Sequence, residues 1–419
     1  MNTVPAESSP APAPSKSPLL SLDEALERLL AAVVPLAETE TVDTFDALGR
    51  VLAVAVQSTV DVPPANNSAM DGYALRTADV PAAGTLLPVS QRIPAGTPPQ
   101  RLATGTAARI FTGAQIPAGA DAVVMQELCG AEGDAVRVQT VPALGASIRR
   151  RGEDVAHGDC VLAAGVRLTP QALGLAASVG IGTLTVARRP RVAFFSTGDE
   201  LVMPGQPLPE GAIYNSNRYM LRGLLEAFGC ECRDLGIVGD TLEATRAALR
   251  EAAACDLVVS CGGVSVGEED HLKPAVEAEG ALQLWQMAIK PGKPLAYGHV
   301  RRTGGGTAHF IGLPGNPVSC FVTFALAVRP VLLRLQGAAD IMAPALSLRA
   351  DFEWPKADRR REFLRARLNA NGGLDLYSHQ GSGVLTSTVW ADGLVDNPPN
   401  QRVAPGDTVR FLPFGGLLS

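Results

Sequence analysis

The sequence predicts a multi-domain protein of the α/β and β classes, built around a central three-layer α/β/α domain with a parallel-rich sheet. The first observation is that apolar runs alternate with helical patterns between residues 188 and 336, as in a sheet covered on both faces. The second is that these apolar runs end in polar or glycine-rich motifs. The third is that short β-like runs, separated by Gly and Pro, occupy segments before and after this region. A chain of 419 residues is long enough for about three domains, or four small ones.

Composition and charge exclude several classes of protein. Hydrophobic residues make up 46% and charged residues 19% of the chain, so it can bury substantial cores. The net charge of -6 argues against nucleic acid as a partner. No apolar run reaches the roughly 18 residues of a membrane span, and the N-terminus lacks the plan of a signal peptide. The seven cysteines are scattered, without a C-x-x-C or a paired zinc spacing. We therefore expect a cytoplasmic protein that binds neither nucleic acid nor a membrane.

The N-terminal third predicts a tail and an elongated mixed domain. Residues 1–18 are rich in Pro, Ala and Ser, which predicts a disordered tail. A capping box of Ser21 and Glu24 begins a helix over 21–34, and Thr169-Pro170 begins a second that runs to Gly180. We expect these two helices to close one mixed domain formed by residues 19–60 and 144–187.

A small β module is expected to be inserted into that domain at residues 61–143, where short extended runs alternate with turns. The loop around Asp71-Gly72 is dense in polar residues, but such a pair is also common in simple turns. Thr112-Gly113 closes one of the module's strands. Just beyond the module, three arginines face Glu153 and Asp154, and a solvated charged turn is the favoured interpretation of that segment.

The domain at 188–336 is predicted from the alternation of strands and helices, and a small β-rich domain follows at 337–419. The expected strands of the first are 192–195, 232–238, 256–260, 282–289, 295–299 and 309–313. Its expected helices are 217–228, 241–253, 271–279 and 317–335. The last domain is expected to contain extended segments at 346–352, 362–368, 373–377, 384–389 and 407–414.

Five polar or glycine-rich motifs follow the strands of the central domain. Open α/β sheets bind ligands outside the carboxyl ends of their strands, so five such ends on one edge describe a pocket. The motifs are Thr197–Glu200, Gly239–Asp240, Gly262–Asp270, Lys290–Pro294 and Leu313–Ser319.

The chemistry of these motifs suits a phosphorylated ligand. Glycines let backbone N–H groups approach an anion, and a helix start at Asn316-Pro317 presents a positive dipole end. The carboxylates among the motifs would repel such an anion unless a hard cation such as Mg²⁺ lay between them. The sequence has neither a G-x-x-x-x-G-K-[ST] loop nor a G-x-G-x-x-G fingerprint after a strand, which argues against a P-loop ATPase or a dinucleotide fold. The residues thus predict a metal-assisted site for a phosphorylated ligand.

Five motifs in order, N-S-A-M-D-G-Y-A, S-T-G-D-E-L, G-G-V-S-V-G-E-E-D, K-P-G-K-P and L-P-G-N-P-V-S, resemble the molybdopterin molybdenumtransferase family. The resemblance is to the bacterial MoeA type, related to the insertase portion of gephyrin, and covers about residues 20 to 415. It implies a four-domain, L-shaped subunit that forms a homodimer with an active site shared between subunits. The implied reaction uses adenylylated molybdopterin and molybdate, requires Mg²⁺, releases AMP and leaves molybdenum on the dithiolene. The implied macromolecular partner is the molybdopterin adenylylation protein.

The resemblance also implies roles for individual residues. Two departures from the family pattern stand out: Arg359 replaces a usual glycine, and Ala65-Asn66 replaces a usual Phe-Asp. The implied catalytic residues are Asp71, Thr112, Asp154, Glu200, Asp240 and Asp270, and the implied metal ligands are Asp199, Glu200, Asp240 and Asp270. The implied pterin, phosphate and molybdate contacts are Thr197, Gly198, Asp199, Gly262, Gly263, Ser265, Lys290, Lys293, Pro294, Pro314, Pro317, Ser319, Arg360 and Ser382.

Two other functions compete with the transferase. A molybdopterin-binding carrier or scaffold related to gephyrin would keep the pocket without turnover. Such a protein would not need the carboxylates that are implied as metal ligands. A nucleotide or pterin hydrolase that used the central domain alone would leave Asp71, Thr112 and Asp154 unexplained. The retained carboxylates favour the enzyme.

Overall fold

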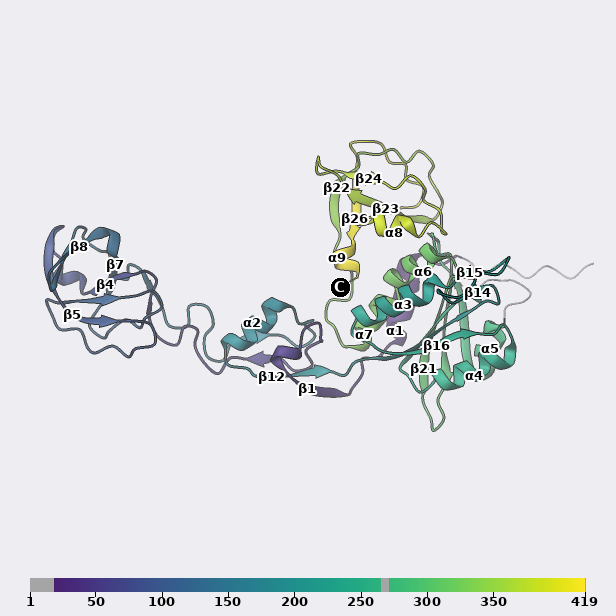
Figure 1. Cartoon of the computed structure of the whole chain (residues 1–419), viewed down its shortest axis with the longest axis horizontal. Helices are drawn as coiled ribbons and strands as arrows, with labels where there is room; N and C mark the ends of the chain where they lie inside the picture. The colour runs from purple at the N-terminus through teal and green to yellow at the C-terminus, as the bar shows by residue number, and fades with distance from the viewer. Residues whose placement is uncertain (1–18, 265–270, 419) are drawn as a thin grey trace, which may run out of the picture. The chain divides into compact units, whose positions relative to one another are not determined.

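The structure is a computed structural model that describes residues 19–264 and 271–418. These residues form two compact units (Figure 1). The larger unit contains residues 19–40, 49–51 and 187–418, and the smaller unit contains residues 41–48 and 52–186.

The larger unit is built on a mixed sheet whose strands lie in the order β16-β13-β17-β21-β20-β18. The first four of these strands are parallel to one another, and β20 and β18 continue the sheet by antiparallel pairing. This confirms the parallel-rich sheet that the strand–helix alternation predicts. The strands are β13 (Arg191–Thr197), β16 (Glu231–Val238), β17 (Leu257–Cys261), β18 (Gly280–Gln286), β20 (Pro294–Arg301) and β21 (Thr307–Leu313).

Helices cover both faces of this sheet, because successive side chains of a strand point to opposite faces. In β13, Val192 and Phe194 pack into one apolar core, and Ala193 and Phe195 pack into the other. The first core is completed by α1 (Leu22–Ala32), α3 (Ser216–Ala227), α6 (Pro317–Thr323) and α7 (Arg329–Leu335), and the second by α4 (Leu242–Ala252) and α5 (Leu272–Glu279). The three-layer arrangement predicted from sequence is therefore observed.

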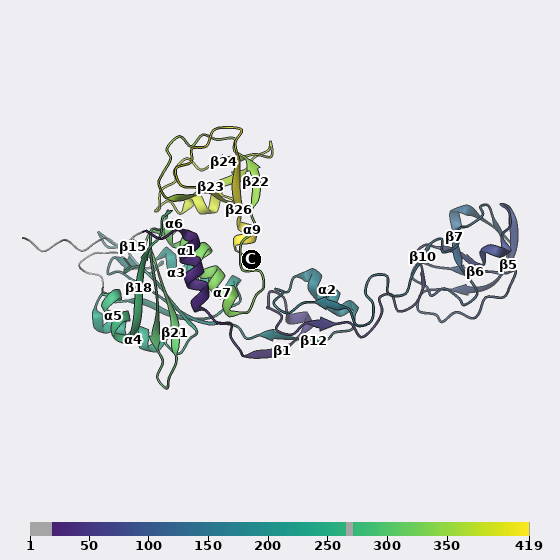
Figure 2. The same ribbon diagram turned by 180° about the vertical axis from the view of Figure 1, so that it is seen from behind.

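Helix α1 belongs to the larger unit, which corrects the expectation that it closes the elongated N-terminal domain. The capping box of Ser21 and Glu24 forms as predicted. The apolar face of the helix, however, packs with Phe194 in the first core of the central sheet. Helix α1 also contacts α7, beside which it lies in Figure 2. Sequence periodicity identifies the apolar face of a helix but not the surface that covers it.

The long apolar helix at 317–335 is interrupted by a π-helical turn, η4 (Phe324–Val328), between α6 and α7. Pro330, near the start of α7, has no N–H to donate, which accounts for the local widening of the helix. Contrary to the expectation from sequence, the 19 residues are long and apolar enough to cross a membrane. They are 94% buried over their most apolar window, as in the core helix of a globular domain.

The C-terminal part of the larger unit is a sheet with strand order β19-β23-β25-β26-β22, and β24 pairs with β23. The β-rich prediction holds, except that residues 384–389 were expected to be extended and instead contribute to a short helix, α8 (Thr386–Trp390). Fully buried Ser387, which accepts a bond from Arg365, lies in this turn. The strands are β19 (Ile289–Lys290), β22 (Leu346–Arg349), β23 (Arg361–Leu368), β24 (Leu374–Leu376), β25 (Gly393–Asn397) and β26 (Thr408–Pro413), followed by α9 (Phe414–Leu417).

The smaller unit contains the predicted β module, a sheet with strand order β7-β4-β6-β5-β9-β8. Its strands are β4 (Gly72–Leu75), β5 (Thr85–Ile93), β6 (Ala107–Ile110), β7 (Ala122–Met125), β8 (Cys129–Glu132) and β9 (Ala135–Val138). The remaining elements are β1 (Thr39–Asp43), β2 (Val56–Gln57), β3 (Asn67–Ser68), β10 (Ile148–Arg149), β11 (Cys160–Leu162), β12 (Thr183–Ala187), α2 (Pro170–Ser178) and the 3-10 turns η1 (Thr44–Asp46), η2 (Thr77–Asp79) and η3 (Gln126–Leu128). One short parallel pair, β14 (Leu201–Val202) with β15 (Ile213–Tyr214), also belongs to the larger unit.

The placement of α1 predicts the effect of Leu29→Ala. Leu29 is fully buried in the first core of the central sheet, so its truncation should lower the free energy of unfolding of the larger unit by about 2–5 kcal/mol. All three tryptophans lie in that unit, so denaturant unfolding followed by tryptophan fluorescence measures it. Leu184→Ala, in the core of the smaller unit, is the matched control and should shift this transition less. An equal shift in the two variants would contradict the assignment of α1.

Candidate functional site

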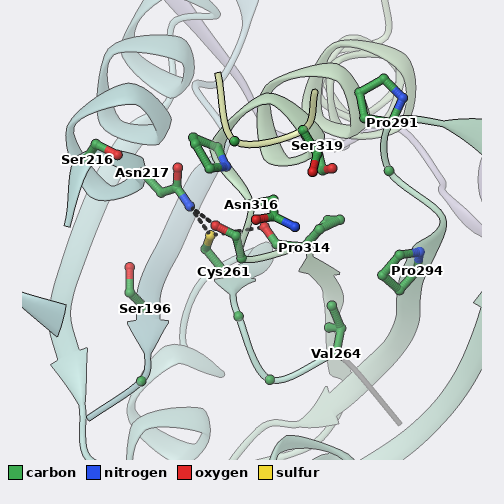
Figure 3. A pocket seen from close by; sticks show the side chains of 18 of the residues that line it. Ser196, Ser216, Asn217, Cys261, Val264, Pro291, Pro294, Pro314, Asn316 and Ser319 are labelled. Atoms are coloured by element: carbon green, nitrogen blue, oxygen red, sulfur yellow. Dashed lines mark hydrogen bonds between the residues drawn. The ribbon is translucent and has the colours of Figure 1, made fainter. Parts of the chain in front are cut away.

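The carboxyl edge of the central sheet carries a pocket of about 1070 Å³. All five motifs predicted to meet there contribute to its lining, so the predicted convergence on one edge is observed. Figure 3 shows three of them, through Val264, through Pro291 and Pro294, and through Pro314, Asn316 and Ser319. The predicted residues that line it are Thr197, Gly198, Glu200, Asp240, Gly262, Gly263, Lys290, Lys293, Pro294, Pro314, Pro317, Ser319, Arg360 and Ser382. Asp199 does not line it, and Ser265 and Asp270 lie outside the described residues.

Two glycines allow the strand-end loops to fold against each other. Gly198 has a φ of 142°, and a Cβ there would lie 2.5 Å from Oε2 of Glu200. Gly262 has a φ of 94°, and a Cβ there would lie 2.7 Å from the carbonyl oxygen of Thr197. A larger residue would be strained by the positive φ at either position; at Gly262 it would also clash with backbone, whereas at Gly198 it would displace the flexible Glu200 carboxylate. The glycines therefore shape the floor of the pocket by permitting close backbone approach.

Asn217 connects two of the loops and was not singled out from the sequence. Its Nδ2 donates to the carbonyl oxygen of Gly315 at 2.7 Å and to Sγ of Cys261 at 3.1 Å (Figure 3). Asn215, which caps α3, also lines the pocket, and Nδ2 of Asn215 and Oδ1 of Asn217 are buried without a hydrogen-bond partner in the structure. The N-x-N spacing at the start of a helix was the signal available in the sequence.

Three cationic side chains line the pocket. Lys290 Nζ donates to Glu362 Oε1 at 2.9 Å and lies 3.5 Å from Asp358 Oδ2. Arg360 donates through Nε and Nη2 to the two oxygens of Asp358, at 3.1 and 2.9 Å. Within residues 19–264 and 271–418, Lys293 has no ion pair. Two of the cations are therefore held by carboxylates, while the third is available to a ligand.

The strand pair β19–β23 brings these cations together. Ile289 pairs with Arg361 and Lys290 with Glu362, in parallel register. Since β19 follows β18 of the central sheet and β23 belongs to the C-terminal sheet, the pair connects the two sheets at the pocket.

The loop that carries Ser382 is fixed by a buried arginine. Arg365 is fully buried, and its Nη2 donates to the carbonyl oxygen of Gly381 at 3.1 Å. Burial lowers the pKa of Arg365 to about 10. The backbone N–H of Val318, in the first turn of α6, donates to the carbonyl oxygen of Ser382 at 2.9 Å. Arg365 was not singled out from the sequence, because nothing in the local pattern distinguishes a buried arginine from an exposed one.

The predicted metal ligands are only partly brought together. Glu200 and Asp240 both line the pocket, and the backbone N–H of Asp240 donates to Oδ1 of Asp199 at 3.3 Å. In the described ranges, no three His, Cys, Asp or Glu side chains are grouped closely enough to hold a metal ion without further ligands. The fourth predicted ligand, Asp270, is not among the described residues.

Asp71 and Thr112 meet in the smaller unit, although they are 41 residues apart in the sequence. The backbone N–H and the hydroxyl of Thr112 both donate to Oδ1 of Asp71, each at 2.8 Å. These bonds hold the pKa of Asp71 below its usual value, the backbone bond being the larger cause. Arg109 donates to the carbonyl oxygen of Gly72 at 2.9 Å and so fixes the adjacent backbone. Asp154 is exposed, and its backbone N–H donates to the carbonyl oxygen of Val62 at 3.0 Å.

The fold and this pocket define a multi-domain α/β protein with a pocket at the carboxyl edge of its central sheet, lined in part by lysine and arginine side chains. The chain matches three family models along its length: the MoeA N-terminal region, domains I and II, at residues 20–180; a probable molybdopterin-binding domain at 193–334; and the MoeA C-terminal region, domain IV, at 347–414.

Curated relatives and solved structures agree with these matches. A molybdopterin molybdenumtransferase of Haemophilus influenzae is 40% identical over 409 residues, covering 96% of this chain and 100% of its own length. One from Nostoc sp. is 37% identical, covering 90% of this chain and 88% of its own. The crystal structure of a molybdopterin biosynthesis moeA protein from Pyrococcus horikoshii OT3 superposes with a TM-score of 0.79 at 31% identity, over 94% of this chain and 100% of that chain. The chain belongs to the MoeA family.

The Asp71–Thr112 contact predicts the effect of Thr112→Val on titration. The valine lacks the hydroxyl donor, so the pKa of Asp71 should rise towards its ordinary value, and protonation should begin at a higher pH than in the unmodified protein. NMR titration of the Asp71 carboxyl carbon measures this shift. Thr112→Ser keeps the hydroxyl and should leave the pKa low. An unchanged pKa in Thr112→Val would show that the backbone bond alone sets it.

Proposed function

We propose that this protein is a molybdopterin molybdenumtransferase that takes adenylylated molybdopterin and molybdate as substrates. The observation that carries the proposal is the pocket, in which Lys290, Lys293 and Arg360 face the same space as the carboxylates of Glu200 and Asp240. One group of residues suits oxyanions and the other suits a cation bound to phosphate. A carrier without turnover is not favoured, because relatives that match across nearly the whole chain are transferases.

The residues present fit an Mg²⁺ ion that is shared with the substrate. Mg²⁺ is usually held by one or two carboxylates together with substrate phosphates and waters, so it does not need a cluster of three protein carboxylates. Glu200 and Asp240 line the pocket and would hold the ion. Asp270, the further ligand implied by the family resemblance, lies outside the described residues. When bound, Mg²⁺ would neutralise charge on the phosphoanhydride oxygens.

The remaining residues bind and orient the reactants. Lys293 is free of ion pairs within the described ranges and binds the molybdate oxygens, with Arg360 and Ser382 beside it. The glycine-rich turns at Gly198 and Gly262–Gly263 allow backbone N–H groups to approach the pterin and its phosphate. Ligation of molybdate forms two Mo–S bonds to the dithiolene, and one molybdate oxygen leaves as water with the two thiol protons. Hydrolysis then consumes one water, breaks the phosphoanhydride bond and releases AMP, and the molybdenum remains on the dithiolene sulfurs.

The proposal is tested by measuring AMP release from adenylylated molybdopterin by the purified full chain. Release is expected only when both molybdate and Mg²⁺ are supplied, because molybdenum transfer and hydrolysis share one pocket. AMP release that proceeds at the same rate without molybdate would favour a simple hydrolase. Pterin binding without AMP release under any condition would favour a carrier.

Lys293→Ala should raise the KM for molybdate by about tenfold or more with a smaller effect on the KM for the pterin substrate. A charge-assisted contact to an oxyanion is worth roughly 1.5–3 kcal/mol. Steady-state AMP release at varied molybdate and varied pterin separates the two constants. Lys273→Ala, on the exposed side of α5, is the matched control and should change neither. An equal rise in both constants would place Lys293 at the phosphate instead.

We further propose that the enzyme works in the cytoplasm as a homodimer and receives its substrate from a molybdopterin adenylylation protein. In this proposal Asp71, Thr112 and Asp154 of one subunit complete the pocket of its partner. Support comes from their position in a compact unit different from the one that carries the pocket. A two-fold dimer makes the same contact twice and so forms two composite sites.

Mixing two inactive variants tests the shared site. Asp71→Asn and Asp240→Asn chains, each inactive as a homodimer, should regain about a quarter of normal activity when co-expressed with random pairing. In the mixed dimer, one site carries both substitutions and the other carries neither. AMP release is measured for the co-expressed mixture and for the isolated heterodimer, in which one of the two sites is intact and about half of normal activity is expected. A heterodimer that stays inactive would mean that each site is built within one chain.

A further inference from the structure

Asp358 holds Arg360 by contacts that leave the other edge of the guanidinium unused. Asp358 Oδ1 accepts hydrogen bonds from both the backbone N–H and Nε of Arg360, at 3.0 and 3.1 Å, and Oδ2 accepts one from Nη2 at 2.9 Å. The Arg360 guanidinium also holds the pKa of Asp358 well below its usual range, so Asp358 stays ionised. The five donors of arginine form a rigid planar fork, so fixing one edge fixes the direction of the other.

Asp358 acts from outside the main pocket. It lines a smaller cavity of about 490 Å³, together with Arg359 and Asn400, and it does not line the main pocket. Arg360 and Lys293 line both cavities. Arg360 is therefore shared by the two cavities; its Nε and Nη2 donate to Asp358, and Nη1 makes no hydrogen bond within the described residues.

Lys290 is held mainly by a different carboxylate. Its partner Glu362 is fully buried and also accepts a hydrogen bond from Trp354 Nε1 at 2.8 Å. Asp358 lies farther from Lys290, at 3.5 Å. Removal of Asp358 would thus release Arg360 while leaving Lys290 attached to Glu362.

We propose that Asp358 is a positioning residue that sets the affinity of the pocket for molybdate by fixing the direction of Arg360. The inference rests on the proposed function and goes beyond it, since Asp358 itself touches no substrate. Two effects of Asp358 oppose each other: its charge repels an oxyanion, and its bonds hold Arg360 in place. The Arg360 guanidinium bonds both carboxylate oxygens and so compensates most of the negative charge of Asp358, whereas replacing the Oδ2 acceptor breaks the two-point contact that fixes the plane of the guanidinium. Orientation is therefore the larger effect.

Asp358→Asn tests this inference, because the two effects predict changes of opposite sign. The variant should raise the KM for molybdate on the order of tenfold, with kcat at saturating molybdate and the KM for pterin nearly unchanged. Asp358→Glu restores a charged fork and should recover part of the loss. Asp351→Asn is the matched control, since Asp351 makes the same kind of two-point contact with Arg349 on an exposed strand and lines neither cavity. An unchanged or lower KM for molybdate in Asp358→Asn would overturn the proposal.

A double-mutant comparison shows whether Asp358 acts through Arg360. In an Arg360→Met background, Asp358→Asn should add less than a twofold change in the KM for molybdate, because the group it orients is gone. Independent, multiplicative effects would overturn the proposal. An unchanged kcat at saturating molybdate and an unchanged KM for pterin show that the pocket is folded in each variant. Failure of the proposed function would appear differently, as a wild-type protein whose AMP release does not depend on molybdate.

Discussion

The pairing of β19 with β23 is the interaction on which the pocket depends. It is only two residues long, yet it attaches the C-terminal sheet to the segment that leaves the central sheet. Without this pairing, Lys290 and Lys293 would lie at the edge of the central sheet with no residues of the C-terminal sheet beside them. With it, Arg360 and Ser382, which come much later in the chain, line the same cavity. The apolar contact of Phe321 with Phe414, ring centroids 5.3 Å apart, supports the same junction from the helix side.

That junction carries a buried charge, which has to be compensated. Glu362 is fully buried, and an isolated carboxylate in such a place would be strongly disfavoured. Lys290 supplies the opposite charge and Trp354 a hydrogen bond, so the ion pair and the strand pairing stabilise each other. Removing one partner of such a pair is costly, since the other charge remains buried. Lys290 is therefore as much a part of the junction as of the ligand pocket.

The central sheet and its ligand edge could be predicted from the sequence for a simple reason. A strand buried on both faces needs apolar residues throughout, as Val192 to Phe195 shows, and its end is marked where the polar residues begin. Because parallel strands end on one edge, Glu200, Asp240 and Gly262 had to lie near one another. Predictions failed where local pattern was ambiguous. Residues 384–389 have the composition of a strand, but their contacts with β23 favour a helical turn, α8.

The sequence by itself determined the layers, the convergence of five loops and the family, because these follow from hydrophobic periodicity and from motifs read locally. Only the tertiary structure decided which surface covers α1, since an apolar helical face fits any apolar partner of suitable shape. It also decided that Arg360 and Lys290 are held by carboxylates while Lys293 is left for a ligand. Charge pairing depends on distances between side chains far apart in the chain, and a sequence contains no such distances until the backbone has folded.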